Sequence, residues 1–114
     1  MKAITLKEPG GPENFELSEI PVPPIKADEL LVKVEATSIN PVDAKARSNR
    51  ERLDWLFKGE KPIVLGWDIS GVVTDVGEAV WGFKKDDEVF GMINFPGKGR
   101  TYAECVAAPA ARVG

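Results

Sequence analysis

The residues best suited to chemistry lie in the segment Asn40-Pro41-Val42-Asp43. The Asn40 amide offers hydrogen-bond donors and an acceptor, and the Asp43 carboxylate offers acceptors. Such a pair can bind a polar ligand. It can also start a helix, with Asn40 as N-cap, Pro41 at the first helical position and Asp43 in the first turn. The two interpretations are compatible, because a helix N-terminus at the rim of a cleft can do both.

Three further side chains could complete a site near this segment. Trp67 could fill the core at a strand entry, or its indole could form the apolar wall of a pocket beside a flat substrate. Asp68 is interpreted as a partner for nearby backbone N–H groups. Arg47 is either a solvated residue on an exposed helix face or a contact for a phosphate or for Asp68.

The chain contains no histidine and a single cysteine, Cys105. An internal disulfide is therefore impossible, and the commonest general base and transition-metal ligand are both missing. Asp43 and Asp68 could offer only oxygen ligands, so we predict no metal site. Cys105 is expected to behave as a small buried hydrophobe. No side chain is assigned as a catalytic group.

The elements that must position these residues are mainly strands. Period-two patterning, divided by turn residues into short segments, predicts a mostly β protein. The clearest strand covers residues 29–37, whose alternate apolar side chains share one face. Further strands are expected at residues 1–6, 15–18, 63–65, 71–74, 88–91 and 101–107. Many short strands favour a small barrel, because closing a sheet hides its edges.

One short helix is expected from Pro41 to about Arg47. Residues 50–62 contain Leu53, Leu56 and Phe57, which could line a second helical turn or pack as an irregular flap, so no element is assigned there. The proline-rich residues 21–24 are expected to form an extended connector.

The composition is typical of one globular domain. The 114 residues are 43% hydrophobic and 29% charged, and no linker or repeat divides them. Fifteen basic and eighteen acidic side chains give a net charge of −3, so we expect no nucleic-acid and no membrane binding. No signal peptide or transmembrane run is found, and a cytoplasmic location is expected. No glycine-rich phosphate-binding loop is present.

Three segments together resemble the medium-chain dehydrogenase/reductase superfamily, within it the quinone oxidoreductase branch. They are residues 36–48 (ATSINPVDAKARS), residues 62–73 (PIVLGWDISGVV) with their continuation to Gly91, and residues 99–106 (GRTYAECV). Their order and spacing cover nearly the whole chain. The resemblance implies that residues 1–114 are a GroES-like N-terminal catalytic domain, a partly open β-barrel with one or two short helices. The Rossmann domain that follows in the family is absent from these residues.

The chain departs from the family pattern at several positions. Zinc-dependent alcohol dehydrogenases of the superfamily have a cysteine where Asn40 stands and a histidine where Trp67 stands, so the resemblance implies a branch without catalytic zinc. It also favours Trp67 as a wall of the substrate pocket. Many quinone oxidoreductases have a tyrosine where Lys45 stands. Asp86 replaces a usual glycine, and aspartate is one of the few side chains that tolerate a left-handed backbone.

The resemblance also implies the cofactor and the reaction. NADPH would be bound mainly by the missing Rossmann domain, with Asn40, Asp43 and Arg47 as cofactor-binding residues of this domain. The parent, expected to be a homodimer, would transfer hydride to a small-molecule quinone, enone or aldehyde-like substrate. Residues 1–114 alone are expected to be inactive. The alternative is a stand-alone GroES-like binding or oligomerisation module without catalysis, comparable with the ring-forming cochaperonin of that fold.

Overall fold

The computed structural model describes residues 1–94 and 98–114, and two antiparallel sheets and two α-helices are formed by these residues. One sheet pairs β1 (Lys2–Leu6) with β2 (Phe15–Glu19). The other has the order β5-β4-β3-β6, and its strands are β3 (Glu29–Ala36), β4 (Asp68–Val76), β5 (Glu88–Met92) and β6 (Cys105–Pro109). Both sheets are open. The expected mostly β, partly open architecture is therefore confirmed, whereas full closure into a barrel is not observed.

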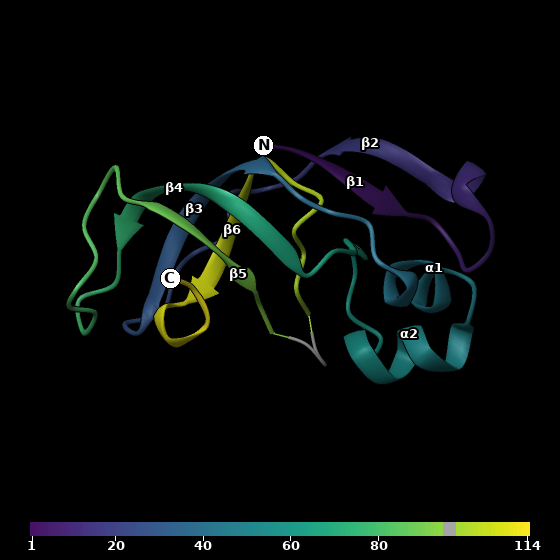
Figure 1. The fold of residues 1–114 in the computed structure, drawn as a ribbon. Coiled ribbons are helices and arrows are strands. Elements are labelled where there is room, and N and C mark those ends of the chain that lie inside the picture. The colour runs from purple at the N-terminus through teal and green to yellow at the C-terminus, as the bar shows by residue number, and fades with distance from the viewer. Residues whose placement is uncertain (95–97) are drawn as a thin grey trace.

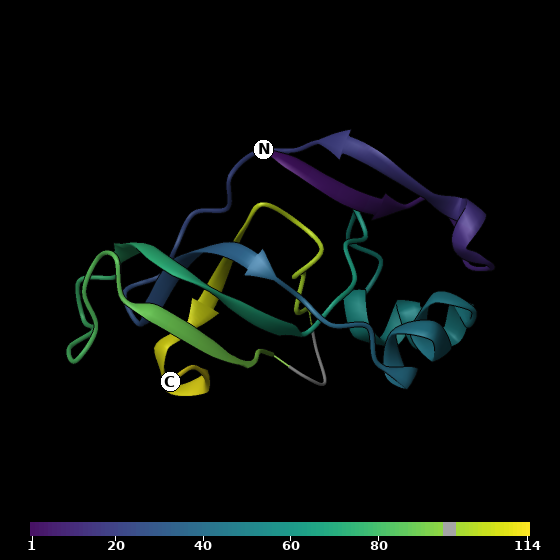
Figure 2. The ribbon, with the colours of Figure 1, turned by 45° about the horizontal axis from the view of Figure 1, so that its top comes forward.

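The molecule is elongated, with extents of 40 × 24 × 22 Å. The β1–β2 hairpin and the two helices lie at one end, and the turn between β4 and β5 lies at the other (Figure 1). The view in Figure 2 shows the hairpin lying apart from the four-stranded sheet. Single bridges from Ala3 to Ala103 and from Leu6 to Ile63 connect β1 to the rest of the described chain.

Helix α1 (Pro41–Arg47) forms as the sequence predicts, with Asn40 as N-cap and Pro41 at its first position. The Asn40 backbone N–H donates to Asp43 Oδ2 at 2.7 Å, which satisfies an amide that the helix itself leaves free.

The segment without an assigned element forms α2 (Arg50–Phe57). The Asn49 side chain caps it by accepting from the Arg52 N–H at 3.0 Å. Leu53, Leu56 and Phe57 are buried, at the spacing of one helical face. The helix ends at Lys58, whose φ of +53° is left-handed.

Two strand predictions need correction. Residues 63–65 form no strand, and only Ile63 makes a bridge, to Leu6. Their apolar run reflects burial, since Val64 and Leu65 are 2% and 0% exposed. The last strand is β6, which begins at Cys105, so residues 101–104 lie outside it.

Two hydrophobic clusters form the core. The first lies within the four-stranded sheet and includes Leu30, Val32, Val73 and Val106. The second joins the helices to the hairpin and contains Leu6, Ala46, Leu53, Leu56, Phe57, Leu65 and Trp67. Asn40 therefore lies between the two clusters. β3, which precedes it, packs in the first cluster, and α1, which follows it, packs in the second.

The outer edge of β5 is partly covered by the end of the chain. The Phe90 N–H donates to the Gly114 carbonyl at 3.1 Å, and the Gly114 N–H donates back at 3.0 Å. This exchange is the pattern of an antiparallel pair. The short 3-10 turn η2 (Ala110–Arg112) brings the chain round from β6 to this edge, while a second such turn, η1 (Pro12–Asn14), precedes β2.

Candidate functional site

Asp68, at the start of β4, is the centre of a polar cluster at the end of β3. Its Oδ2 atom accepts hydrogen bonds from Ser38 Oγ and from Asn40 Nδ2, both at 2.7 Å. The sequence interpretation of Asp68 as a partner of backbone N–H groups is therefore replaced by one in which it holds two side chains. A carboxylate can only accept, so these bonds fix the Asn40 amide with its nitrogen toward Asp68.

Thr37 joins the same two strands one step earlier in the chain. Its hydroxyl donates to the Asp68 carbonyl oxygen at 2.6 Å and lies 3.0 Å from the Thr101 hydroxyl. Thr101 is fully buried. Because β3 ends at Ala36, these side-chain bonds continue the connection between β3 and β4 beyond the backbone ladder.

Asp43 is buried, with 3% of its surface exposed. Its Oδ2 accepts from the Asn40 N–H, while its Oδ1 makes no hydrogen bond of standard length and angle. The Tyr102 phenol is nevertheless close enough for Asp43 to influence its ionisation. Burial raises the pKa of Tyr102, and the Asp43 carboxylate raises it further. The phenol is therefore neutral at physiological pH, and it is available as a hydrogen-bond donor toward Asp43.

Tyr102 differs from the sequence interpretation, in which its hydroxyl lay at the surface. The ring is half-buried and packs edge-on against Phe15, with ring centroids 6.3 Å apart. Both rings line an apolar groove of about 600 Å³, together with the exposed side chains Leu17 and Ile39. The groove therefore extends to Ile39, the residue directly before Asn40.

Arg47 is half-buried at the end of α1. Its Nε donates to the Gly10 carbonyl at 3.0 Å, and the Gly10 N–H donates back to the Arg47 carbonyl at 2.9 Å. The predicted contact with Asp68 is not among the ion pairs of the described residues. Arg47 instead fastens the loop after β1 to α1, and its expected role toward a cofactor stays a prediction.

Trp67 is 1% exposed and belongs to the cluster that joins the helices to the hairpin. Its expected role as a wall of a substrate pocket stays a prediction. Gly66, the residue before it, has a φ of +98°, and a Cβ there would collide with the Thr101 hydroxyl and the Tyr102 ring. Glycine is therefore required for Trp67 to turn inward at this point.

The donor set at this site does not fit a catalytic zinc ion. A zinc site needs Cys, His or carboxylate ligands in a tetrahedral cluster. Asn40 and Trp67 supply an amide and a buried indole, and no group of three or more His, Cys, Asp and Glu side chains suited to a metal occurs among residues 1–94 and 98–114. No helix in that part of the chain is long and apolar enough to cross a membrane.

Comparison with known families decides the classification. Residues 26–114 match the model of the alcohol dehydrogenase GroES-like domain. The chain belongs to this family. Its relatives also place the chain in the medium-chain dehydrogenase/reductase superfamily, in the quinone oxidoreductase-like branch. The GroES-like character expected from the sequence is thereby confirmed.

Three relatives illustrate the relationship. The NADPH-dependent alkenal/one oxidoreductase of Arabidopsis thaliana chloroplasts is 42% identical over 98 residues, which cover 82% of this chain and 24% of the relative. The quinone oxidoreductase of Sus scrofa is 38% identical, over 90% of this chain and 30% of its own. The structure of the quinone oxidoreductase from Coxiella burnetii superimposes with a TM-score of 0.88 at 35% identity, over 99% of this chain and 36% of that one.

The chain thus spans about a quarter to a third of the length of these relatives. Among the predicted site residues, the structure brings Asn40 and Asp43 together at the start of α1, whereas Arg47 faces Gly10 and Trp67 faces the core. Sequence reasoning missed Ser38 and undervalued Asp68. The available signal was that Asp68 directly follows Trp67, the position at which the resemblance implies a histidine in zinc-dependent alcohol dehydrogenases.

Proposed function

We propose that residues 1–114 form the N-terminal catalytic domain of a zinc-independent, NADPH-dependent oxidoreductase that reduces a quinone, an enone or a related aldehyde-like substrate. A Rossmann domain outside these residues would carry most of the cofactor. The observation that carries the proposal is the Asn40–Asp68 hydrogen bond at the former metal-ligand position. Where zinc-dependent relatives would hold a metal, this chain holds an oriented amide.

The oriented amide suits a nicotinamide cofactor. A carboxamide and a ribose hydroxyl are recognised by groups that can both donate and accept, and Asn40 is such a group. Asp68 and Ser38 hold it on one side, and the buried Asp43 holds its backbone. NADPH would supply the hydride, while Asn40, Asp43 and Arg47 would lie on the side of the nicotinamide and its ribose.

The substrate would be positioned rather than activated by a Lewis acid. Charge that develops on a substrate oxygen would be met by hydrogen-bond donors or solvent. Lys45 is exposed on α1 where many relatives have a tyrosine, so no phenol is available from that position. The buried indole of Trp67 and the exposed side chain of Ile39 would contribute apolar surface beside the cofactor.

The first test is cofactor binding by the 114-residue chain. Because half of the enclosing cleft would be missing, isothermal titration with NADPH should give no binding tighter than millimolar, and the chain should not oxidise NADPH with quinones. A micromolar dissociation constant would contradict this division of labour between two domains.

The second test supplies the missing part. The chain replaces the matching segment of the Coxiella burnetii quinone oxidoreductase, and NADPH oxidation with a quinone is measured. In this chimera, Asn40→Ala should lower kcat/KM by about tenfold or more, which is the loss expected when one hydrogen-bonding group that a carboxylate holds in place is removed. Arg52→Ala, on the exposed face of α2, is the matched control and should have no effect. A folded chimera that binds NADPH but reduces no quinone would refute the proposal.

The competing function is a binding or oligomerisation module. The exposed apolar side chains of the hairpin and of the β5 face, Leu17 and Phe90 among them, would favour it. Light scattering distinguishes the two. A stable ring would support the module, and a monomer of the 114-residue chain at micromolar concentration would support the reductase domain.

The reductase proposal also includes a cytoplasmic location and a homodimeric full-length parent.

A further inference from the structure

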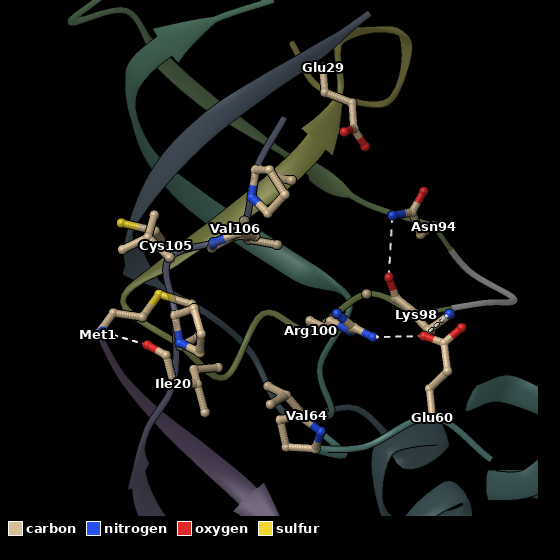
Figure 3. A pocket seen from close by; sticks show the side chains of 18 residues that line it. Met1, Ile20, Glu29, Glu60, Val64, Asn94, Lys98, Arg100, Cys105 and Val106 are labelled. Carbon is tan, nitrogen blue, oxygen red and sulfur yellow. Dashed lines mark hydrogen bonds and ion pairs between the residues drawn. The ribbon is translucent and has the colours of Figure 1, made fainter. Parts of the chain in front are cut away.

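A second cavity lies away from the Asn40–Asp68 cluster and shares no side chain with it. Its volume is about 460 Å³, which is in the range of small-molecule sites. Figure 3 shows it between the N-terminus, the proline-rich connector, β6 and the segment from Lys98 to Arg100. It is therefore a separate feature, independent of the function proposed above.

One end of the cavity carries a surplus positive charge. Glu60 Oε2 contacts Lys98 Nζ closely and lies 3.3 Å from the Arg100 terminal nitrogen Nη2. One carboxylate thus serves two cations. The hydrogen bond and the charge of Lys98 lower the pKa of Glu60, so the carboxylate stays ionised at neutral pH. Arg100 Nε is buried and has no hydrogen-bond acceptor among the described residues.

The other charged groups on the wall, Glu29 and the Met1 ammonium, form hydrogen bonds within the chain. Glu29 Oε1 accepts from the Lys26 N–H at 2.8 Å. The Met1 ammonium donates to the Ile20 carbonyl at 2.6 Å and lies 3.5 Å from Glu19 Oε2. Glu29 lies at the opposite end of the cavity from Lys98 and Arg100 (Figure 3), so at their end two cations share the single carboxylate of Glu60.

The charged end is held in place by its backbone. Arg100 has a φ of +60°, in the left-handed region that ordinary side chains avoid, and Asn94 has a φ of +56°, a conformation that asparagine tolerates. Asn94 Nδ2 donates to the Lys98 carbonyl at 3.3 Å, and the Thr101 N–H donates to the Gly66 carbonyl at 3.2 Å. Unfavourable backbone geometry that the surrounding contacts maintain is common at binding sites.

The remaining walls are apolar. They are formed by the connector at residues 20–24, by Val64 and by Val106 (Figure 3). Both valines are nearly fully buried, so they line the cavity from beneath. A ligand of matching chemistry has an apolar body and one negative charge at its end.

We propose that this cavity binds a small aliphatic monocarboxylate, with the carboxylate at Lys98 and Arg100 and the hydrocarbon against the connector, Val64 and Val106. The carboxylate of the ligand and the carboxylate of Glu60 compete for the same two cations, Lys98 and Arg100. A neutral ligand of the same shape lacks this interaction.

The test is a titration of the isotope-labelled 114-residue chain with sodium octanoate, followed by amide chemical shifts in NMR spectra. Saturable shifts are expected at Val64, Arg100 and Val106. 1-Octanol should bind about tenfold more weakly, because a charge-assisted hydrogen bond contributes roughly that factor. Equal affinity for octanol and octanoate would overturn the proposal, as would shifts confined to the groove at Ile39.

Two variants test the competition. Arg100→Gln should weaken octanoate binding by about tenfold, whereas Glu60→Gln should strengthen it, because the competing carboxylate is removed. A purely structural role of Glu60 predicts the opposite sign. Arg52→Gln, outside the cavity, is the control and should leave the affinity unchanged. If Arg100→Gln does not fold, Glu60→Gln decides: unchanged or weaker binding refutes the site.

Discussion

Asn40 and Asp68 lie 28 positions apart in the sequence, and a 2.7 Å hydrogen bond joins Nδ2 of the first to Oδ2 of the second. The bond connects the start of α1 to the start of β4. It therefore connects α1, which packs in the cluster of the helices and the hairpin, to β4, which packs in the cluster of the four-stranded sheet.

Removing the Asp68 carboxylate should destabilise this connection. Asp68→Ala leaves the Ser38 hydroxyl and the Asn40 amide without their shared acceptor. Because Ser38 is exposed and can bind water, the expected loss in the free energy of unfolding is about 1–2 kcal/mol. Urea denaturation measures it. Glu78→Ala, at an exposed position in the β4–β5 turn, is the control, and a loss no larger than that of the control would contradict the prediction.

A pair of glycines separates steric clash from backbone strain. Gly66 and Gly82 both have left-handed φ values, +98° and +88°, but only at Gly66 would a Cβ meet other atoms. Gly82→Ala should cost about 1 kcal/mol and Gly66→Ala about 3 kcal/mol or more, since overpacking adds to the strain. Thermal and urea unfolding test the difference. Equal losses at the two positions would show that the Thr101 and Tyr102 side chains move aside freely.

Tyr102 is the only tyrosine of the chain, so its titration can be followed directly by phenolate absorbance. Burial and Asp43 raise its pKa above the ordinary value of about 10. The folded state therefore holds the phenol proton more tightly than the unfolded state does. The resulting stabilisation is complete below pH about 10 and is lost as the pH rises toward the folded-state pKa.

The absorbance midpoint of the folded chain should thus lie above that of the urea-unfolded chain. Asp43→Asn should lower it toward the ordinary value without reaching it, because burial is the larger cause. A midpoint that is the same in folded and unfolded chains would exclude the contact between Tyr102 and Asp43.

Cys105, the single thiol, should react slowly with disulfide reagents near neutral pH. Burial raises its pKa, and the neighbouring Glu104 raises it further, so less of the reactive thiolate is present. Glu104→Gln should increase the rate, though by less than unfolding in urea does. A rate in the folded chain equal to that of a short cysteine peptide would contradict the prediction.

Local signals in the sequence predicted the elements well where capping or turn chemistry decides them. The Asn40-Pro41-Val42-Asp43 segment identified α1, and Asp86 has the left-handed backbone expected for its place, with a φ of +75°. The expected strand at residues 63–65 was wrong because an apolar run can report burial alone. Val64 and Leu65 are buried, and of the three residues only Ile63 pairs, through a single bridge to Leu6.

The site was predictable only in part, because its contacts join distant segments. The Asn40–Asp43 contact is local and follows from helix capping. The bond from Asn40 to Asp68 requires the pairing of β3 with β4, including a register shift between Val34 and Ala36 that no spacing in the sequence indicates. Arg47 was given an outward role because the return of the loop at Gly10 could not be foreseen.

The burial of Trp67 makes the chain its own optical probe. Of the three tryptophans, Trp55 and Trp81 are 65% and 90% exposed, whereas Trp67 is 1% exposed. A water-soluble quencher such as iodide would suppress emission from the first two indoles and spare the third. The residual, blue-shifted fluorescence would then report on the contact region of helices and hairpin alone, without any label.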